Sequence, residues 1–279
     1  RQRQMYIRDR SLDRRFFYNS LMSTIPKVLI IAGSDSGGGA GIQADIKAIT
    51  FFKGFAMTAI TAVTAQNTIG VQAIHPVPGT IVIDQINSVM EDLSPDIIKI
   101  GMLTDLDIIN FISENLESYK IILDPVMVAT SGDVLVNDDV INSIKVKLLE
   151  KSFLITPNIY EAEILSGKKI NSLQDQLEIG KELVKMGSKN VLVKGGHGNL
   201  DTIHDVLICA DGNHHIFESK KIKSKNTHGT GCTLASAIAT NIAKKIDVKE
   251  SIKISIEYVQ NGIRNAPEFG SGSGPIRHF

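Results

Sequence analysis

The residues best suited to chemistry lie close together in Lys225–Thr233, which reads Lys-Asn-Thr-His-Gly-Thr-Gly-Cys-Thr. Gly229 and Gly231 allow the backbone to turn its N–H groups toward one point. The apolar spacing from Thr233 to Lys245 predicts a helix, whose first turn adds unpaired N–H groups and the positive end of its dipole. The stretch therefore predicts an anion site, most naturally for a phosphate. A glycine turn that only caps a core helix is the structural alternative.

Cys232 stands at the expected start of that helix. The helix dipole there favours a thiolate, so Cys232 is a candidate base for a substrate proton. Its alternative role is a small buried apolar residue, which is also what we expect of Cys209, in mid-strand. Two cysteines do not make a secreted disulfide framework, and a reducing, intracellular setting fits them best.

The elements that position these residues alternate along the chain. Short apolar runs are typical of strands buried on both faces, and amphipathic segments between them are typical of helices. We expect strands at 28–32, 56–66, 97–100, 121–123, 153–155 and 191–193, and helices near 42–52, 83–93, 105–117, 138–149, 172–186 and 233–245. Asp211-Gly212 predicts a hairpin between 205–210 and 214–219. The pattern indicates an α/β fold with a doubly wound, mostly parallel sheet, in one domain at 26–279.

Ligands of such sheets bind beyond the carboxyl ends of the strands. The residues expected there are Gly33 to Asp35, Gln66, Met102, Asp124, Asn158, Lys194 and the turn at 229–232. An acid, an amide, a lysine, an anion turn and a thiol indicate phosphoryl transfer more than hydride transfer. The glycine loop at 33–41 can be forced onto a dinucleotide-binding spacing. No second strand ending in an acid follows it, so we read the loop as a close-approach surface for a ligand.

Composition narrows the possible partners. The chain is 43% hydrophobic, which suffices for a large core, and its formal net charge is zero. Residues beyond 25 hold 24 Lys and Arg against 28 Asp and Glu, so we expect no nucleic-acid partner. No apolar run approaches the roughly 18 residues that cross a bilayer, so no membrane partner is expected either.

Residues 1–25 form a basic segment with six Arg against Asp9 and Asp13. We expect a disordered extension outside the folded domain. An Arg-rich segment is typical of an organelle presequence, but the two acids and the low Ser content weaken that reading, and a start at Met22 explains the segment equally well. The expected location is the cytoplasm.

These motifs together resemble the hydroxymethylpyrimidine and phosphomethylpyrimidine kinases of thiamine biosynthesis, in the ribokinase-like superfamily. The resemblance runs from Val28 to Phe279 and is carried by 31–45, 64–68, 99–103, 123–127, 156–161, 194–197, 226–232 and 274–279. It implies a three-layer α/β/α sandwich and transfer of the ATP γ-phosphate with Mg²⁺, first to a hydroxymethyl group and then to the phosphate monoester so formed. It also implies a homodimer.

The resemblance assigns roles residue by residue. It places the catalytic centre at Cys232, Lys194, Gly229 and Gly231, and the pyrimidine pocket at Gln66, Gly33, Ala40, Asp45, Met102 and Val126. It places the nucleotide at Asn158, Glu161, Lys194, Thr227 and Thr230, and the magnesium at Asp124 and Glu161, partly through water. His197 and His228 lie in the same loops, and we expect neither to be the base.

The sequence departs from the family pattern at two places, and two alternative functions remain open. Thr64 stands where the family often has an aliphatic residue on the pocket wall, and 271–273 approaches the tail without the family's histidine. A pyridoxal kinase, which phosphorylates another flat heterocycle with a hydroxymethyl arm, is the alternative within the class. A catalytically silent pyrimidine-binding regulator is the alternative outside it, and the joint presence of Cys232 and Lys194 argues against it.

Overall fold

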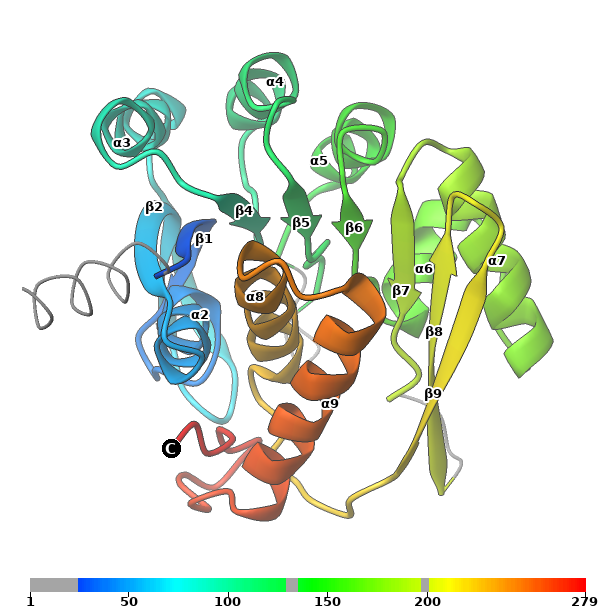
Figure 1. Cartoon of the computed structure of the whole chain (residues 1–279). Helices are drawn as coiled ribbons and strands as arrows, with labels where there is room; N and C mark the ends of the chain where they lie inside the picture. Colours follow the sequence, from blue (N-terminus) through cyan, green and yellow to red (C-terminus); the bar gives the residue numbers. More distant parts are fainter. Residues whose placement is uncertain (1–24, 129–134, 197–200) are drawn as a thin grey trace, which may run out of the picture.

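The computed structural model describes residues 25–128, 135–196 and 201–279. Over these residues the strands form one nine-stranded sheet. The strands that Figure 1 labels lie side by side in it. Its order is β3 (Val71–Pro76), β2 (Phe55–Gln66), β1 (Lys27–Asp35), β4 (Ile97–Ile100), β5 (Ile121–Leu123), β6 (Leu154–Ile155), β7 (Asn190–Val193), β8 (Thr202–Cys209) and β9 (His214–Lys220). The strands from β2 to β7 are parallel, while β3, β8 and β9 are antiparallel to their neighbours.

Helices cover both faces of the sheet, which makes three layers (Figure 1). One face carries α3 (Gly79–Asp92), α4 (Leu106–Asn115), α5 (Asp138–Ser143) with its π-helical continuation η1 (Ile144–Leu148), α6 (Ile159–Ser166) and α7 (Leu173–Lys185). The other carries α2 (Gly41–Phe51), α8 (Thr230–Ala243) and α9 (Val248–Arg264). Successive side chains of β1 point to opposite faces of the sheet. Leu29 and Ile31 pack against the first set of helices, and Val28 and Ile30 pack against the second. The predicted α/β/α sandwich is confirmed.

The strand order reverses at β1, which has β2 on one side and β4 on the other. The chain leaves β1 for α2 on one face, and leaves the β2–β3 pair for α3 on the opposite face. Ligand crevices of open α/β sheets form where the connections diverge in this way. The fold therefore places its crevice at the carboxyl ends of β1 and β4.

The structure differs from the sequence prediction at several elements, and two of its helices, α6 and α9, lie outside the expected helices. Strand β3 was not expected, because most of its residues are exposed and give no apolar run. The expected helix at 138–149 changes from α to π geometry after Ser143. Helix α8 begins at Thr230 and not at Thr233, because Gly229 adopts a left-handed φ of 80° and acts as the N-cap. Gly231 and Cys232 thus lie inside the first helical turn.

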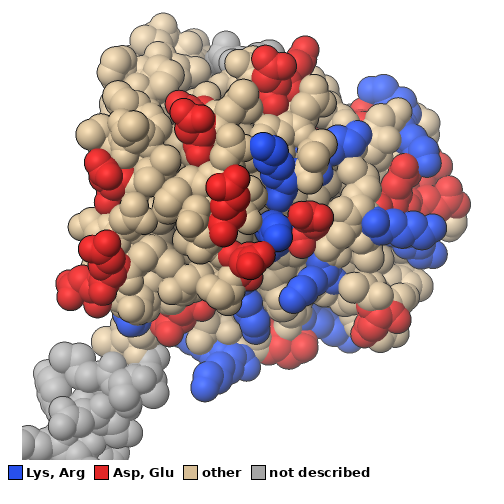
Figure 2. Space-filling model, turned by 90° about the horizontal axis from the view of Figure 1, so that it is seen from above, with Lys and Arg blue, Asp and Glu red and all other residues tan. Residues whose placement is uncertain are grey.

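The surface above α3, α4 and α5 mixes acidic and basic side chains (Figure 2). Among the helices of the described chain, none combines the length and apolarity that a bilayer crossing requires. Of the predicted extension at 1–25, only Ile25 is described, and the rest of that prediction lies outside the described residues.

Candidate active site

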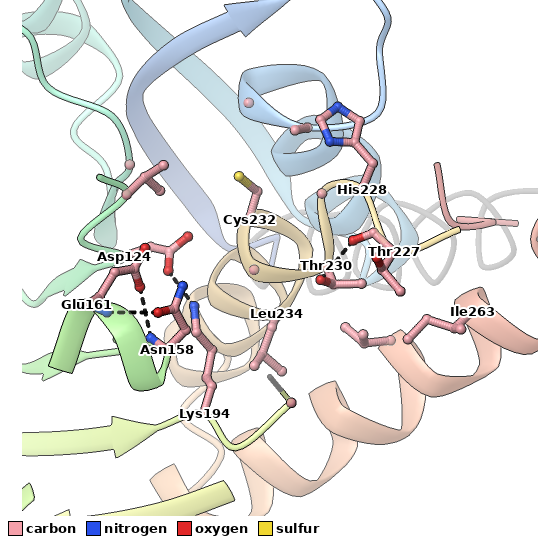
Figure 3. A pocket seen from close by; sticks show the side chains of 18 of the residues that line it. Asp124, Asn158, Glu161, Lys194, Thr227, His228, Thr230, Cys232, Leu234 and Ile263 are labelled. Atoms are coloured by element: carbon pink, nitrogen blue, oxygen red, sulfur yellow. Dashed lines mark hydrogen bonds and ion pairs between the residues drawn. The ribbon is translucent and has the colours of Figure 1, made fainter. Parts of the chain in front are cut away.

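A cavity of about 580 Å³ opens at the carboxyl ends of the strands. Fourteen of the fifteen residues that the sequence proposes for the site line it: Gly33, Ala40, Gln66, Met102, Asp124, Val126, Asn158, Glu161, Lys194, Thr227, Thr230, Gly229, Gly231 and Cys232. In Figure 3 Asp124, Asn158, Glu161 and Lys194 gather on one side, Thr227 and His228 lie on the other, and Cys232 stands between them. Asp45 is the exception and does not reach the wall.

The predicted glycine turn brings α8 against the rest of the site. A Cβ on Gly229 would collide with the carbonyl oxygen of Gly39, so the turn fits only as glycine. A Cβ on Gly231 would lie 3.3 Å from Nζ of Lys194 and 3.6 Å from Oδ2 of Asp124. The N–H groups and positive dipole end of α8 therefore meet a lysine and a carboxylate at one point.

Lys194 and Asp124 form an ion pair at the ends of β7 and β5. Nζ of Lys194 lies 2.9 Å from Oδ1 of Asp124, which also accepts a hydrogen bond from Oγ1 of Thr156 at 3.0 Å. Burial opposes both charges, but their mutual attraction prevails: the pKa of Asp124 is lowered and that of Lys194 is raised. Lys194 is thus a fixed cation beside the anion site.

Asn158 and Glu161 form the start of α6. The Asn158 side chain accepts from the N–H of Glu161, and Oε2 of Glu161 accepts from the N–H of Asn158, each at 2.8 Å. This capping box fixes the Glu161 carboxyl group beneath the cavity. Burial raises its pKa to about 7; Lys194 opposes the rise and the charge of Asp124 adds to it. Two close carboxyl groups with oxygen lone pairs are a donor set that suits Mg²⁺ held partly through water.

Cys232 departs from the expected thiolate. Cys232 lines the cavity and is partly exposed, but burial raises the pKa of its thiol to about 12. Lys99 opposes this rise, while the carboxylates of Asp45 and Asp124 add to it. The resting group is a thiol, and the prediction that the helix dipole makes it a thiolate is wrong for the unliganded protein.

Asp45 does not line the pyrimidine pocket as proposed. Its carboxylate lies 2.9 Å from Nζ of Lys99, with both side chains wholly buried, and it accepts a hydrogen bond from Oγ of Ser236 at 2.7 Å. Lys99 itself reaches the cavity wall, although sequence reasoning took it as an ordinary strand residue. A lysine inside a four-residue buried strand was the available signal, since such a charge requires a partner.

The wall toward β1 and β2 is formed by Gly33, Met102 and the glycine loop after β1. A Cβ on Gly33 would collide with Cε of Met102, so the glycine lets that methionine lie against the strand. Asp35, which was expected at the ligand end of its strand without a stated role, accepts hydrogen bonds from the N–H groups of Gly37, Gly39 and Ala40 at 2.8, 3.0 and 2.8 Å. The Asp35 carboxylate thereby fixes the backbone of the glycine loop at the edge of the cavity.

The cavity also has an apolar end, a cluster of apolar side chains beside polar ones such as Lys220 and Gln260, which was not found in the sequence. Its lining includes Ile203, Ile222, Ile256, Val259 and Ile263. These side chains come from β8, from the segment after β9 and from α9, which have no motif in common. Oγ1 of Thr230 donates to the carbonyl of Thr227 at 3.0 Å between this end and the anion site.

The fold and the site together define a ribokinase-like phosphotransferase. The S. aureus pyridoxal kinase in complex with ADP superposes with a TM-score of 0.84 at 30% identity, covering 91% of this chain and 93% of that one. The phosphomethylpyrimidine kinase from Clostridium difficile superposes with a TM-score of 0.74 at 39% identity, covering 85% and 98%.

Within that class the sequence identifies the family. The model of the phosphomethylpyrimidine kinase family matches residues 35–277. The hydroxymethylpyrimidine/phosphomethylpyrimidine kinase of Bacillus subtilis is 44% identical over 260 residues, which are 92% of this chain and 96% of the relative. The chain belongs to the phosphomethylpyrimidine kinase family, which confirms the resemblance seen in its motifs.

Proposed function

We propose that this protein phosphorylates 4-amino-5-hydroxymethyl-2-methylpyrimidine and then its monophosphate, using ATP, in thiamine biosynthesis. The observation that carries the proposal is the meeting of Gly231, Lys194 and Asp124 at the start of α8. It combines backbone donors, a fixed cation and a carboxylate at one point, as charge neutralisation during phosphoryl transfer requires. Family membership and the identity to the B. subtilis kinase support the choice of substrate.

In this proposal the start of α8 and Lys194 hold the phosphoryl group in transfer. The N–H groups of Gly229, Gly231 and Cys232 would donate to its oxygens, and the Lys194 ammonium would offset the charge that develops on them. Because Asp124 fixes Lys194 from behind, the cation is in place before the substrates bind.

The nucleotide end follows from the same geometry. Complexes of the S. aureus pyridoxal kinase with ADP and AMP-PCP support nucleotide use by this fold. Thr227 and Thr230 would lie beside the nucleotide phosphates, and the apolar end of the cavity would take the base. Asp124 and Glu161 would hold Mg²⁺, with Asn158 orienting Glu161, and the cation would supply positive charge that offsets the charge of the phosphates.

The acceptor would lie against the wall formed by Gly33, Ala40, Met102 and Val126, with Gln66 hydrogen-bonded to its aminopyrimidine edge. Cys232 would face the hydroxymethyl oxygen. The catalytic roles of Gly229 and Gly231 are those of backbone donors.

A pyridoxal kinase is the second candidate, because pyridoxal kinases superpose well on this chain. We expect the pyrimidine to be the better substrate, since the kinase of B. subtilis is closer in sequence than these structures. Comparing kcat/KM for the pyrimidine and for pyridoxal in an ADP-release assay tests this. A higher kcat/KM for pyridoxal would favour the second candidate, and no ATP consumption with either would favour a binding protein.

A homodimer and a cytoplasmic location complete the proposal. Sedimentation velocity on the purified chain tests the first, with a dimer expected at micromolar concentration. Fractionation of expressing cells tests the second.

A further inference from the structure

The side-chain amide of Gln66 lies between two groups whose hydrogens are already committed. Its Nε2 is placed 3.0 Å from Nε2 of His228, and its Oε1 is placed 3.4 Å from Oγ1 of Thr64. The two ends of an amide differ only in whether they donate or accept, and a half-turn about the last side-chain bond exchanges them. The neighbours therefore decide which end belongs where.

His228 can only donate at this position. Its Nε2 lies 2.9 Å from Oδ2 of Asp35, and both side chains are buried. Burial opposes the Asp35 charge, but hydrogen bonds from His228 and from the N–H of Ala40 hold its pKa below the usual value, so it only accepts. The proton must then sit on Nε2 of His228. With its proton there, Nε2 has no lone pair for the N–H of Gln66.

Thr64 leads to the same conclusion from the other side. Its hydroxyl has one hydrogen and faces two acceptors, the carbonyl oxygen of Ser34 at 3.0 Å and Oε1 of Gln66 at 3.4 Å. The shorter bond to Ser34 uses that hydrogen, so the hydroxyl oxygen can only accept from Gln66. Turning the amide relieves both conflicts. Oε1 then faces the Nε2–H of His228, which it would share as a second acceptor with Asp35, and Nε2 can donate to the hydroxyl oxygen of Thr64.

We propose that Asp35–His228 and Ser34–Thr64 are two positioning pairs that fix the Gln66 amide with Oε1 toward His228 and Nε2 toward Thr64. Each amide atom would keep one free site, an acceptor on the His228 side and a donor on the Thr64 side, and Gln66 lines the cavity. This edge fits an exocyclic amino group next to a ring nitrogen, in one orientation only. The proposal rests on the proposed function, and it adds the residues that set the substrate's orientation.

The tautomer of His228 tests the proposal without substrate or activity. A long-range ¹H–¹⁵N correlation spectrum of the unliganded protein distinguishes a protonated from an unprotonated Nε2, and His228→Gln assigns the signal by its loss. We expect a protonated Nε2. A neutral ring protonated only on Nδ1 would overturn the proposal, whereas failure of the proposed function would leave this spectrum unchanged.

Matched variants test the consequence for binding. His228→Leu removes the donor to Asp35, while His228→Gln keeps an N–H for it. We expect KM for the pyrimidine to rise about tenfold or more in His228→Leu and to return to within about threefold of wild type in His228→Gln, with KM for ATP unmoved. Equal KM values in the two variants would show a packing role only and would contradict the proposal.

Variants of Thr64 test the second positioning pair independently. Thr64→Val is nearly isosteric but cannot accept, and Thr64→Ser retains the hydroxyl. The proposal predicts a several-fold higher pyrimidine KM for Thr64→Val and a near wild-type value for Thr64→Ser. An unchanged KM for the pyrimidine in Thr64→Val would show that the Ser34–Thr64 pair does not position Gln66.

Discussion

Lys99 of β4 and Asp45 of α2 form an ion pair of 2.9 Å in which both side chains are wholly buried. Ser236, one helical turn after Cys232, donates to the same carboxylate at 2.7 Å. The pair thus joins the sheet, α2 and α8 beneath the proposed acceptor site. Since 54 residues separate Lys99 from Asp45, their pairing is a property of the fold and not of either segment.

Lys99→Met should destabilise the protein by about 3–5 kcal/mol, because it leaves the Asp45 charge buried without its cation. Urea denaturation measures the change. The double variant Asp45→Leu/Lys99→Met removes both charges and should recover at least half of the loss. If the double variant is less stable than Lys99→Met alone, the pair is not the source of the effect.

Lys194→Ala should lower kcat by about 10²–10³ for both the alcohol and the monophosphate, because the same phosphoryl charge develops in both steps. Steady-state kinetics on the two acceptors measures it. Lys189→Ala, an exposed lysine near the other end of β7, serves as the control. A loss confined to KM for ATP would make Lys194 a ground-state binding residue.

Cys232→Ala should lower kcat for the alcohol by about 10² or more and for the monophosphate much less, because only the alcohol must lose a proton as it attacks. Equal losses on both substrates would mean that Cys232 shapes the anion site and is not a base.

The pH dependence of kcat tests whether Cys232 acts as the base. Because burial raises the pKa of the Cys232 thiol to about 12, the thiolate fraction below that pH grows about tenfold per pH unit. If the thiolate is the base, kcat for the alcohol should rise through pH 7–9 in the wild type and flatten in Cys232→Ala, while the monophosphate step should show no such rise. The same flat profile in both proteins would rule out the thiolate.

His278 should make stability depend on acid pH. Burial lowers its pKa to about 4, with help from the charge of Lys47. Its Nδ1 lies 3.1 Å from the Tyr258 hydroxyl, and its buried Nε2 finds no partner within the described chain. Between the unfolded pKa near 6.5 and about 4, the unfolded state binds the extra proton, so stability falls as pH falls. The loss relative to His278→Phe should reach about 3 kcal/mol in urea denaturation, and a pH-independent difference would contradict it.

The parallel core of the fold could be predicted from the sequence because its signals are local. Each central strand is a short apolar run, and the residue after it falls at the same edge of the sheet. That rule placed Gln66, Asp124, Asn158 and Lys194 around one cavity, where the structure has them.

The features of the site that could not be predicted depend on contacts between segments distant in the sequence. The burial of Asp45 is set by Lys99, and the pKa of Cys232 by depth and by two carboxylates, none of which a helix-start pattern reveals. His228 was placed in the right loop, but its contact with Asp35 joins residues 193 positions apart. The apolar end of the cavity combines side chains of β8 and α9 that carry no common motif.

The central claim is that one active site performs two successive phosphoryl transfers. A ³¹P NMR time course that starts from the pyrimidine alcohol, ATP and Mg²⁺ with this protein alone tests it most directly. The account predicts that the pyrimidine monophosphate signal rises first and then gives way to the diphosphate, with two ATP consumed per pyrimidine. A reaction that stops at the monophosphate, or that leaves the alcohol unconsumed, would contradict it.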